Sequence, residues 1–463
     1  MTGLRLERDS SEPIYQQIAE QLRSQIASGA LPLGCRLPTV RSLAGSLDVA
    51  RQTVLEAYRL LGSWGLTEAR VGDGTRVVRE LPSAEARERL AALLASGPMA
   101  DYEPLSSAGG LRSLATAVPD PALFLHDEFL AEIAELRNAS PWAFYYAPPA
   151  GLPELRYALA RERETAEAEL LVTLGANHAI GLLLDELCSP GDQILVEEPG
   201  FLGMESFLTM RGLVAVRAPS GSAGLDLDAL RSLVKGVKAI LCWPSFGPAT
   251  GSLAPLETRR EIVRLAEERG IYVVEDAHYR PIAFYGQPPR LRSLSRSRFV
   301  VEVDSLSGYL APGLRAGWVI ADRELIGRLE QRVRGTGSAG LGFSQLALAG
   351  YLRKGRLAAH LERVIPRYRA RRAALTSGLR FEWPDESAWF EPLGGLSVWV
   401  TLPTGGRYED LYEQSLIRGV PFAPGALFGA PSNTLRLSFG TQRPESIQEA
   451  MAILGRLVRD RVR

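Results

Sequence analysis

Several short apolar runs of this sequence are followed by residues that suit the binding of a phosphate group. Gly175, Ala176 and Asn177 follow the run at 170–174 and open a helical pattern. The first backbone N–H groups of a helix, together with its dipole, can hold a phosphate. Arg315 adds a guanidinium, which can bind two phosphate oxygens at once.

Other residues in similar positions suit a planar ring and a carboxylate. Phe201 could stack on a ring, although a lone aromatic residue is more often part of the core. Asp276 follows the run at 271–275 and could pair with a protonated ring nitrogen, and Tyr279 could reach a ring hydroxyl. Asp276 could equally be a helix cap. Arg436 could bind the carboxylate of a substrate.

These residues depend on a sheet for their placement. Apolar runs alternate with helical patterns from about residue 143 onward, which predicts a mainly parallel sheet wrapped by helices. The predicted strands are 170–174, 193–197, 213–217, 239–243, 271–275, 299–303 and 318–320. Ligands of such sheets bind at the carboxyl ends of the strands, where the residues above fall.

The first eighty residues have a different pattern. Ile14, Ile18, Leu22 and Ile26 recur on one helical face, and two shorter helices are predicted after Pro38. The third of these helices begins with polar residues that face outward, as in a helix-turn-helix that reads base edges in the major groove. Two short strands around a Gly-Asp-Gly turn follow at 66–78 and predict a hairpin.

Eight residues of this region are candidates for contacts with DNA phosphates and bases. They are Arg36, Arg41, Arg51, Gln52, Thr53, Gly72, Gly74 and Arg76. The alternative is that the arginines form an ordinary solvated face. Ala50 stands where a hydroxyl residue would cap the third helix, and the missing cap costs about 1 kcal/mol.

Bulk composition narrows the possible classes of protein. The 53 basic and 53 acidic residues balance, so any surface for nucleic acid must be local. Cys35, Cys188 and Cys242 are scattered and histidine is rare, which argues against a disulfide framework or a metal site. The start of the chain is polar, and no apolar run approaches membrane-spanning length. We therefore expect a cytoplasmic protein with no membrane partner.

The N-terminal region resembles a GntR-type winged helix. The matching segments are 36–44, 49–54, 57–61 and 72–75, in the order of the family. This resemblance implies binding to a double-stranded DNA operator.

The rest of the chain, from about residue 117 to Arg436, resembles a class I aminotransferase of fold type I. Residues 305–315 read SLSGYLAPGLR and are similar to the family signature S-x-S-K-x-x-A-P-G-x-R, in which the lysine holds pyridoxal phosphate as a Schiff base. Gly308 stands at the lysine position. The resemblance adds Ser305 and Ser307 to the predicted cofactor-binding residues. The three lysines of the chain, Lys235, Lys238 and Lys354, are far from this motif in the sequence.

The two resemblances together are typical of MocR-type regulators. They imply a winged helix-turn-helix at 1–79, mainly α with a β-hairpin wing, a linker at 80–110, and an α/β aminotransferase-like domain at 111–463 that binds an effector and forms a homodimer. Phe246, Ala249, Asn177 and His178 depart from residues that are common in these regulators. No catalytic residue is predicted.

Three interpretations remain open at this point. The domain could bind a small effector without a Schiff base: a vitamin B6 phosphate, its amino acid adduct or an amino compound. It could be an active aminotransferase fused to a DNA-binding domain, with a substitute base such as His278. It could also be a dimerisation body that has lost the cofactor.

Overall fold

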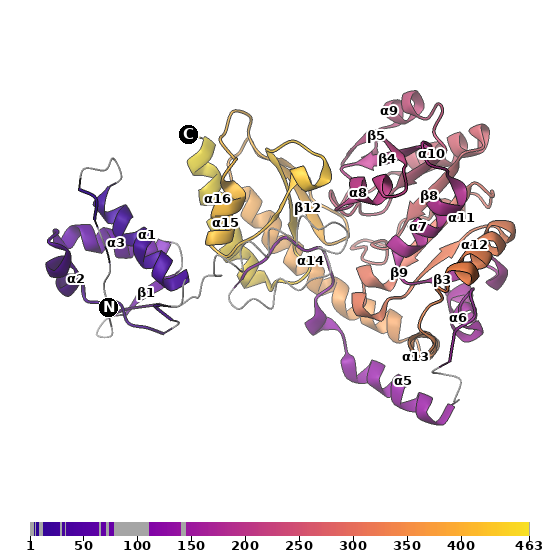
Figure 1. Cartoon of the computed structure of the whole chain (residues 1–463), viewed down its shortest axis with the longest axis horizontal. Coiled ribbons are helices and arrows are strands. Elements are labelled where there is room, and N and C mark those ends of the chain that lie inside the picture. Colours follow the sequence, from indigo (N-terminus) through magenta and orange to yellow (C-terminus); the bar gives the residue numbers. More distant parts are fainter. Residues whose placement is uncertain are drawn as a thin grey trace.

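The structure is a computed structural model that describes residues 4, 6–8, 13–27, 30–32, 34–63, 66–70, 74–77, 111–139 and 145–462. The predicted linker at 80–110 and the candidate residue Gly72 lie outside the described residues. Figure 1 shows the N-terminal helices as a body separate from the rest of the chain.

The N-terminal body has the predicted winged-helix elements. Its helices are α1 (Ile14–Ala27), α2 (Val40–Leu47) and α3 (Arg51–Ser63), and its strands are β1 (Thr67–Arg70) and β2 (Gly74–Val77). The two strands pair antiparallel, which confirms the hairpin. Ile18, Leu22, Val54 and Leu61 are almost fully buried where α1 packs on α3. This shared apolar core fixes α3 relative to the rest of the body.

The large domain is built on an eight-stranded sheet. In spatial order its strands are β3 (Leu170–Thr173), β10 (Gly317–Ile320), β9 (Val300–Ser305), β8 (Tyr272–Asp276), β7 (Ala239–Cys242), β4 (Gln193–Glu198), β5 (Val214–Gly221) and β6 (Gly224–Leu225). β10 runs antiparallel to both of its neighbours, and β6 runs antiparallel to β5. The other pairs are parallel, so the predicted mainly parallel sheet is confirmed.

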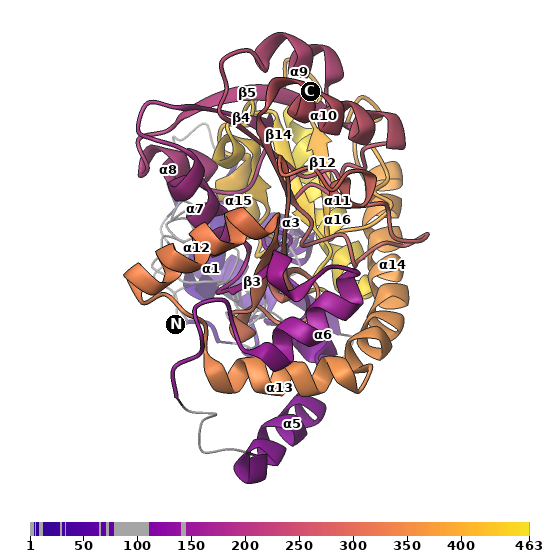
Figure 2. The ribbon, with the colours of Figure 1, turned by 90° about the vertical axis from the view of Figure 1, so that its right-hand side faces the viewer.

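Helices cover both faces of this sheet. The helices of the large domain are α5 (His126–Ala139), α6 (Pro153–Arg163), α7 (Ala176–Leu187), α8 (Met204–Thr209), α9 (Leu227–Leu233), α10 (Leu256–Arg269), α11 (Leu291–Leu294), α12 (Arg323–Thr336), α13 (Gly342–Arg353), α14 (Arg356–Glu382), α15 (Leu411–Ile417) and α16 (Pro444–Val462). Figure 2 shows α7, α8 and α12 on one side of the strands and α10 and α11 on the other. Ile194 and Val196 pack toward α7, whereas Leu195 packs toward α10. Such two-sided burial explains why the strands read as continuous apolar runs.

A second, smaller sheet lies toward the C-terminus. Its strands are β11 (Ala388–Trp389), β12 (Ser397–Thr401), β14 (Thr434–Ser438) and β13 (Ala423–Pro424), and all of its pairs are antiparallel. Helix α14 runs from the large sheet toward this smaller one (Figure 1). Leu375 and Leu379 of α14 are buried in one core with Leu454 of α16, so the two regions of the large domain share apolar packing.

Candidate functional site

A pocket lies at the carboxyl ends of β3, β4, β8 and β9. Its lining residues are Ala117, Val118, Ala176, Asn177, Phe201, Leu202, Pro248, Asp276, His278, Tyr279, Ser305, Ser307 and Gly308. Most of the predicted cofactor-binding residues are therefore brought together, and Gly175 and Arg315 lie beside them. The cavity measures only about 50 Å³, whereas pockets for small ligands usually enclose about 300–1,000 Å³.

One end of this pocket has the geometry of an anion cradle. Gly175 has φ of 114° and precedes α7, so the helix begins at the pocket with its free N–H groups. A Cβ added at Gly175 would lie 3.6 Å from both Nη1 of Arg315 and Oγ of Ser305. The backbone N–H of Ser307 donates to Oγ of Ser305 at 3.2 Å. A guanidinium, hydroxyl groups and a helix N-terminus thus converge, which suits a phosphate.

His178 stands just behind this cradle. The backbone N–H of Leu174 donates to its Nδ1 at 3.1 Å, so this nitrogen acts as an acceptor. Burial lowers the pKa of His178, and the positive charge of Arg315 lowers it further. The histidine therefore supports the turn as a neutral ring and adds no positive charge to the cradle.

The opposite end of the pocket is occupied by the chain itself. Oδ2 of Asp276 accepts a hydrogen bond from Nε1 of Trp243 at 3.0 Å, and its Oδ1 lies 2.9 Å from Nδ1 of His278. The backbone N–H of His278 also donates to Oδ1 at 3.2 Å. Both oxygens of the buried carboxylate are thus engaged by protein groups, and a ring nitrogen would have to displace one of them.

Tyr279 and Phe201 are also held by contacts within the protein. The hydroxyl of Tyr279 donates to the carbonyl oxygen of Ala117, and its ring lies 4.0 Å from that of His278. Phe201 meets Trp243 edge to face, with ring centroids 5.8 Å apart. Both aromatic residues line the cavity and form part of the buried core. The core alternative for Phe201 is therefore confirmed, and its contact with a ligand ring stays a prediction.

Gly308 lies in the short helical turn Leu306–Gly308 after β9 and is buried against His278. A Cβ at position 308 would lie 2.7 Å from Cδ2 of His278 and closer still to the backbone oxygen of the same residue. Real Cβ atoms do not approach other atoms this closely. Any side chain at 308 therefore requires the main chain of His278 to move.

The three lysines of the chain are exposed, and Lys354 is paired with Glu132 and Glu135.

Arg436 does not line the pocket and is engaged by main-chain carbonyl groups. It lies on β14, is fully buried, and donates from Nη2 to the carbonyl oxygen of Ala115 at 2.6 Å and from Nη1 to that of Pro248 at 3.3 Å. Its guanidinium also lies 5.0 Å from the ring centroid of Phe428. In this arrangement Arg436 ties three loops together, and its predicted contact with a substrate carboxylate would require these bonds to break.

Trp243 and His278 were missing from the predicted set of site residues. Each follows the end of a buried strand, β7 for Trp243 and β8 for His278, and this position was the available signal. The hydrogen bond from Trp243 to Asp276 joins residues 33 positions apart and has no counterpart in a local pattern.

The N-terminal candidates at described positions lie before α2, on α2, at the start of α3 and on β2. Arg36, Arg41, Arg51 and Gln52 are exposed and Thr53 is half-buried. Arg76 of β2 donates to the carbonyl oxygen of Gly34 at 2.9 Å, and its main chain bridges that of Arg36. The wing is thereby joined to the segment that precedes α2.

The described residues contain neither a metal-binding cluster nor a helix that could span a membrane. No group of three or more His, Cys, Asp or Glu side chains in the described part of the chain could hold a metal ion. Among the helices at described positions, none is long and apolar enough to cross a membrane.

Comparison with known proteins agrees with the two-part fold. Residues 120–454 match the class I and II aminotransferases. The chain belongs to this family. Residues 14–77 match the gntR family of bacterial regulatory proteins, so the chain joins a GntR-type winged helix to an aminotransferase fold.

Three similar proteins illustrate both parts. LysN, an α-aminoadipate aminotransferase of Thermus thermophilus solved with N-(5'-phosphopyridoxyl)-L-leucine, superposes with a TM-score of 0.74 at 31% identity, covering 81% of this chain and 97% of LysN. The uncharacterized HTH-type transcriptional regulator YdcR of Escherichia coli is 30% identical over 97% of this chain and 99% of its own length. The probable rhizopine catabolism regulatory protein MocR of Rhizobium meliloti is 27% identical over 90% of this chain and 88% of its own.

The family depends on pyridoxal phosphate, and the pocket matches this cofactor only in part. The cradle of Gly175, Ser305 and Arg315 fits the phosphate. The other end does not fit the ring, because the cavity is about 50 Å³ and His278 is bonded to Asp276. The pocket residues at described positions include no amine that could bond to an aldehyde.

Proposed function

We propose that this protein is a DNA-binding transcriptional regulator of the GntR/MocR type whose aminotransferase-like domain binds a small ligand without covalent attachment. The observation that carries the proposal is Gly308, which lines the pocket where the family signature has a lysine and has no space for a Cβ. The GntR-type helices support DNA binding, since Arg51 and Gln52 lie at the exposed start of α3.

Loss of turnover follows from the groups that are present. Pyridoxal phosphate bonded to a lysine serves as an electron sink for amino acid chemistry, and the lysine also carries protons. Glycine at 308 can do neither. Positioned acid–base transfer is worth about a hundred- to ten-thousand-fold in rate, so its loss leaves little turnover.

The ligand is a vitamin B6 phosphate, its amino acid adduct or an amino compound. The cradle supports a ligand with a phosphate, held by the N–H groups at the start of α7 and by Arg315. Binding of a ring requires His278 to leave Asp276, and the carboxylate then becomes available to a protonated ring nitrogen. The hydrogen bond between His278 and Asp276 would in this way be replaced by one between the ligand and Asp276.

Regulation would act through a homodimer. Exposed apolar side chains occur at Leu130 of α5, at Tyr145 and Tyr146, and at Leu341 and Phe343 near the start of α13. Exposed apolar surface of this kind is typical of an interface. A ligand that favours one dimer geometry changes the spacing of the two winged helices on a repeated operator in the cytoplasm.

Two measurements test this proposal. A footprint with the purified protein on its own promoter region should show a protected repeated site, and the absence of sequence-selective protection would refute the role as a regulator. Incubation with pyridoxal phosphate followed by desalting should leave no visible absorption band on the protein. A retained band, or transfer of an amino group above the rate without protein, would refute the noncovalent ligand.

A further inference from the structure

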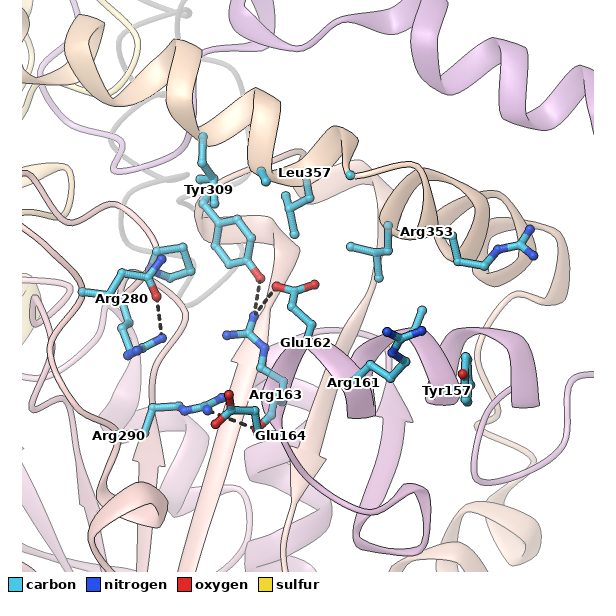
Figure 3. Close-up of a pocket in the computed structure, with 17 residues that line it drawn as sticks. Tyr157, Arg161, Glu162, Arg163, Glu164, Arg280, Arg290, Tyr309, Arg353 and Leu357 are labelled. Carbon is cyan, nitrogen blue, oxygen red and sulfur yellow. Dashed lines mark hydrogen bonds and ion pairs between the residues drawn. The ribbon is translucent and has the colours of Figure 1, made fainter.

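A much larger cavity lies on the other side of Tyr309, outside the pocket described above. It encloses about 900 Å³ between the end of α6, the loop around Arg280 and the junction of α13 with α14 (Figure 3). Five arginines and two glutamates line it, so its charged groups are mostly positive. None of the predicted cofactor-binding residues lines this cavity, and Tyr309, which does, is the chain neighbour of Gly308.

Two of the five arginines are neutralised by buried carboxylates. Nη2 of Arg163 lies 2.9 Å from Oδ2 of Asp304 and 3.3 Å from the hydroxyl of Tyr309, which it contacts in Figure 3. Nη1 of Arg290 lies 3.6 Å from Oε1 of Glu302. These pairs form the rigid floor of the cavity, and their charges are already balanced.

Arg280 and Arg161 have no such carboxylates. Arg280 donates to the carbonyl oxygen of Pro288 and to Oε1 of Gln287, both at 2.7 Å, and both of these groups are neutral. Arg161 lies 5.9 Å from the ring centroid of Tyr157 and forms no ion pair with any residue that the structure describes. Burial lowers the pKa of Arg280, and the charges of Arg290 and Arg163 lower it further, while Glu302 and Asp304 partly offset this effect. An anion beside Arg280 and Arg161 would gain a direct charge partner that neither arginine has within the described residues.

Four apolar side chains line the facing wall of the cavity, beside Arg353 at the end of α13. Leu357, Ala358 and Leu361 of α14 and Leu352 of α13 line it, and Leu357 is buried. Removing such a surface from water is favourable. An apolar group that covers it therefore binds with a favourable free energy in proportion to the apolar area buried. One wall therefore attracts negative charge and the other attracts a hydrocarbon or aromatic group.

We propose that this cavity is a second effector site, which binds an organic anion with a carboxylate or phosphate head against Arg280 and Arg161 and an apolar body against α14. The volume lies within the range of small-molecule sites. The site is independent of the cradle at Arg315, although Tyr309 places it one residue from Gly308 in the chain.

Calorimetric titration of the full chain with three probes tests the site. 4-Phenylbutyrate carries both head and body, 4-phenylbutanamide has the body without the charge, and inorganic phosphate has the charge without the body. We expect the carboxylate to bind at least about tenfold more tightly than either of the others. Equal binding of the amide, or of inorganic phosphate, would overturn the proposal.

Variants locate the binding. Arg280→Gln and Arg161→Gln should each weaken 4-phenylbutyrate by about tenfold, whereas the matched control Arg260→Gln, exposed on α10, should not. Ala358→Trp fills the exposed edge of the cavity without entering the core and should abolish binding even if the arginine variants fold poorly. Arg315→Gln should leave this binding unchanged. Unaltered affinity in Ala358→Trp, or loss of affinity in Arg315→Gln, would show that the probe binds elsewhere.

Discussion

The imidazole Cδ2 of His278 lies 2.7 Å from the position that a Cβ at residue 308 would take, and the backbone oxygen of His278 lies closer still. The loop after β8 and the turn after β9 therefore pack so closely that residue 308 has no room for a side chain. A lysine returned to this position would meet the main chain at its first carbon.

Gly308→Ala should lower the free energy of unfolding by about 1–3 kcal/mol, because the added methyl group forces the main chain of His278 to shift. Urea denaturation of the large domain measures the effect. Gly313→Ala is the matched control, since a Cβ there has no atom within 4 Å. Equal stability of the two variants would mean that the loop at 278 yields freely.

His278→Ala should strengthen the binding of pyridoxamine phosphate by about tenfold, because it releases Oδ1 of Asp276 and enlarges the cavity. Thermal shift and calorimetry with pyridoxamine phosphate measure this change. His126→Ala, at an exposed position on α5, serves as control. Weaker binding in His278→Ala would assign the imidazole a direct role in holding the ligand.

Arg51→Ala should weaken specific DNA binding by about 1–3 kcal/mol if Arg51 reads a base, or reduce the salt dependence by about one unit if it contacts a phosphate. Gel-shift titrations at several salt concentrations distinguish these results. Arg59→Ala, exposed on the same helix but two turns from its start, should have a smaller effect. Similar losses in both variants would place the DNA surface elsewhere on α3.

The buried His360 makes stability depend on pH. Its Nε2 lies 3.0 Å from the carbonyl oxygen of Tyr309 and its Nδ1 lies 3.1 Å from Nη2 of Arg363, so the neutral ring donates to one group and accepts from the other. Burial lowers the pKa of His360 to about 4, below the value of about 6.5 in an unfolded chain.

Below pH 6.5 the unfolded state takes up a proton that the folded state does not, so stability should fall as the pH drops from about 6.5 to about 4, by up to about 3 kcal/mol. His360→Gln should remove this part of the pH dependence, as measured by denaturation at a series of pH values. His126→Gln should retain it, since His126 is exposed. An unchanged slope in His360→Gln would assign the acid sensitivity to other groups.

The strands and the winged helix could be predicted from sequence because their signals are local. Apolar runs marked all seven predicted strands, and the four-residue step from Ile14 to Ile26 marked α1. Most of the candidate pocket residues could be proposed for the same reason, since they end or follow a strand and the carboxyl ends of parallel strands meet at one edge, whereas Arg315 precedes β10.

The partners of those residues could not be predicted in this way. Tyr279 bonds to Ala117, 162 positions earlier, and Arg436 bonds to Ala115, 321 positions earlier. Such contacts depend on how the segment at 111–120 crosses the domain. The local spacing of apolar residues does not predict that course. The second cavity was missed for a similar reason, because its arginines come from α6, from the segment after β8 and from the end of α13.

The segment at 111–120 also covers part of the pocket. Ala117 and Val118 form part of the roof of the pocket, and Leu114 is fastened to Pro421 and Ser438 by main-chain hydrogen bonds. The same stretch of chain continues backward, through residues 78–110, to the winged helix. A molecule that enters beside Asp276 must push against this roof or loosen the bond from Tyr279 to Ala117. The segment that lines the pocket at Ala117 and Val118 is thus the described part of the large domain that comes nearest in sequence to the winged helix.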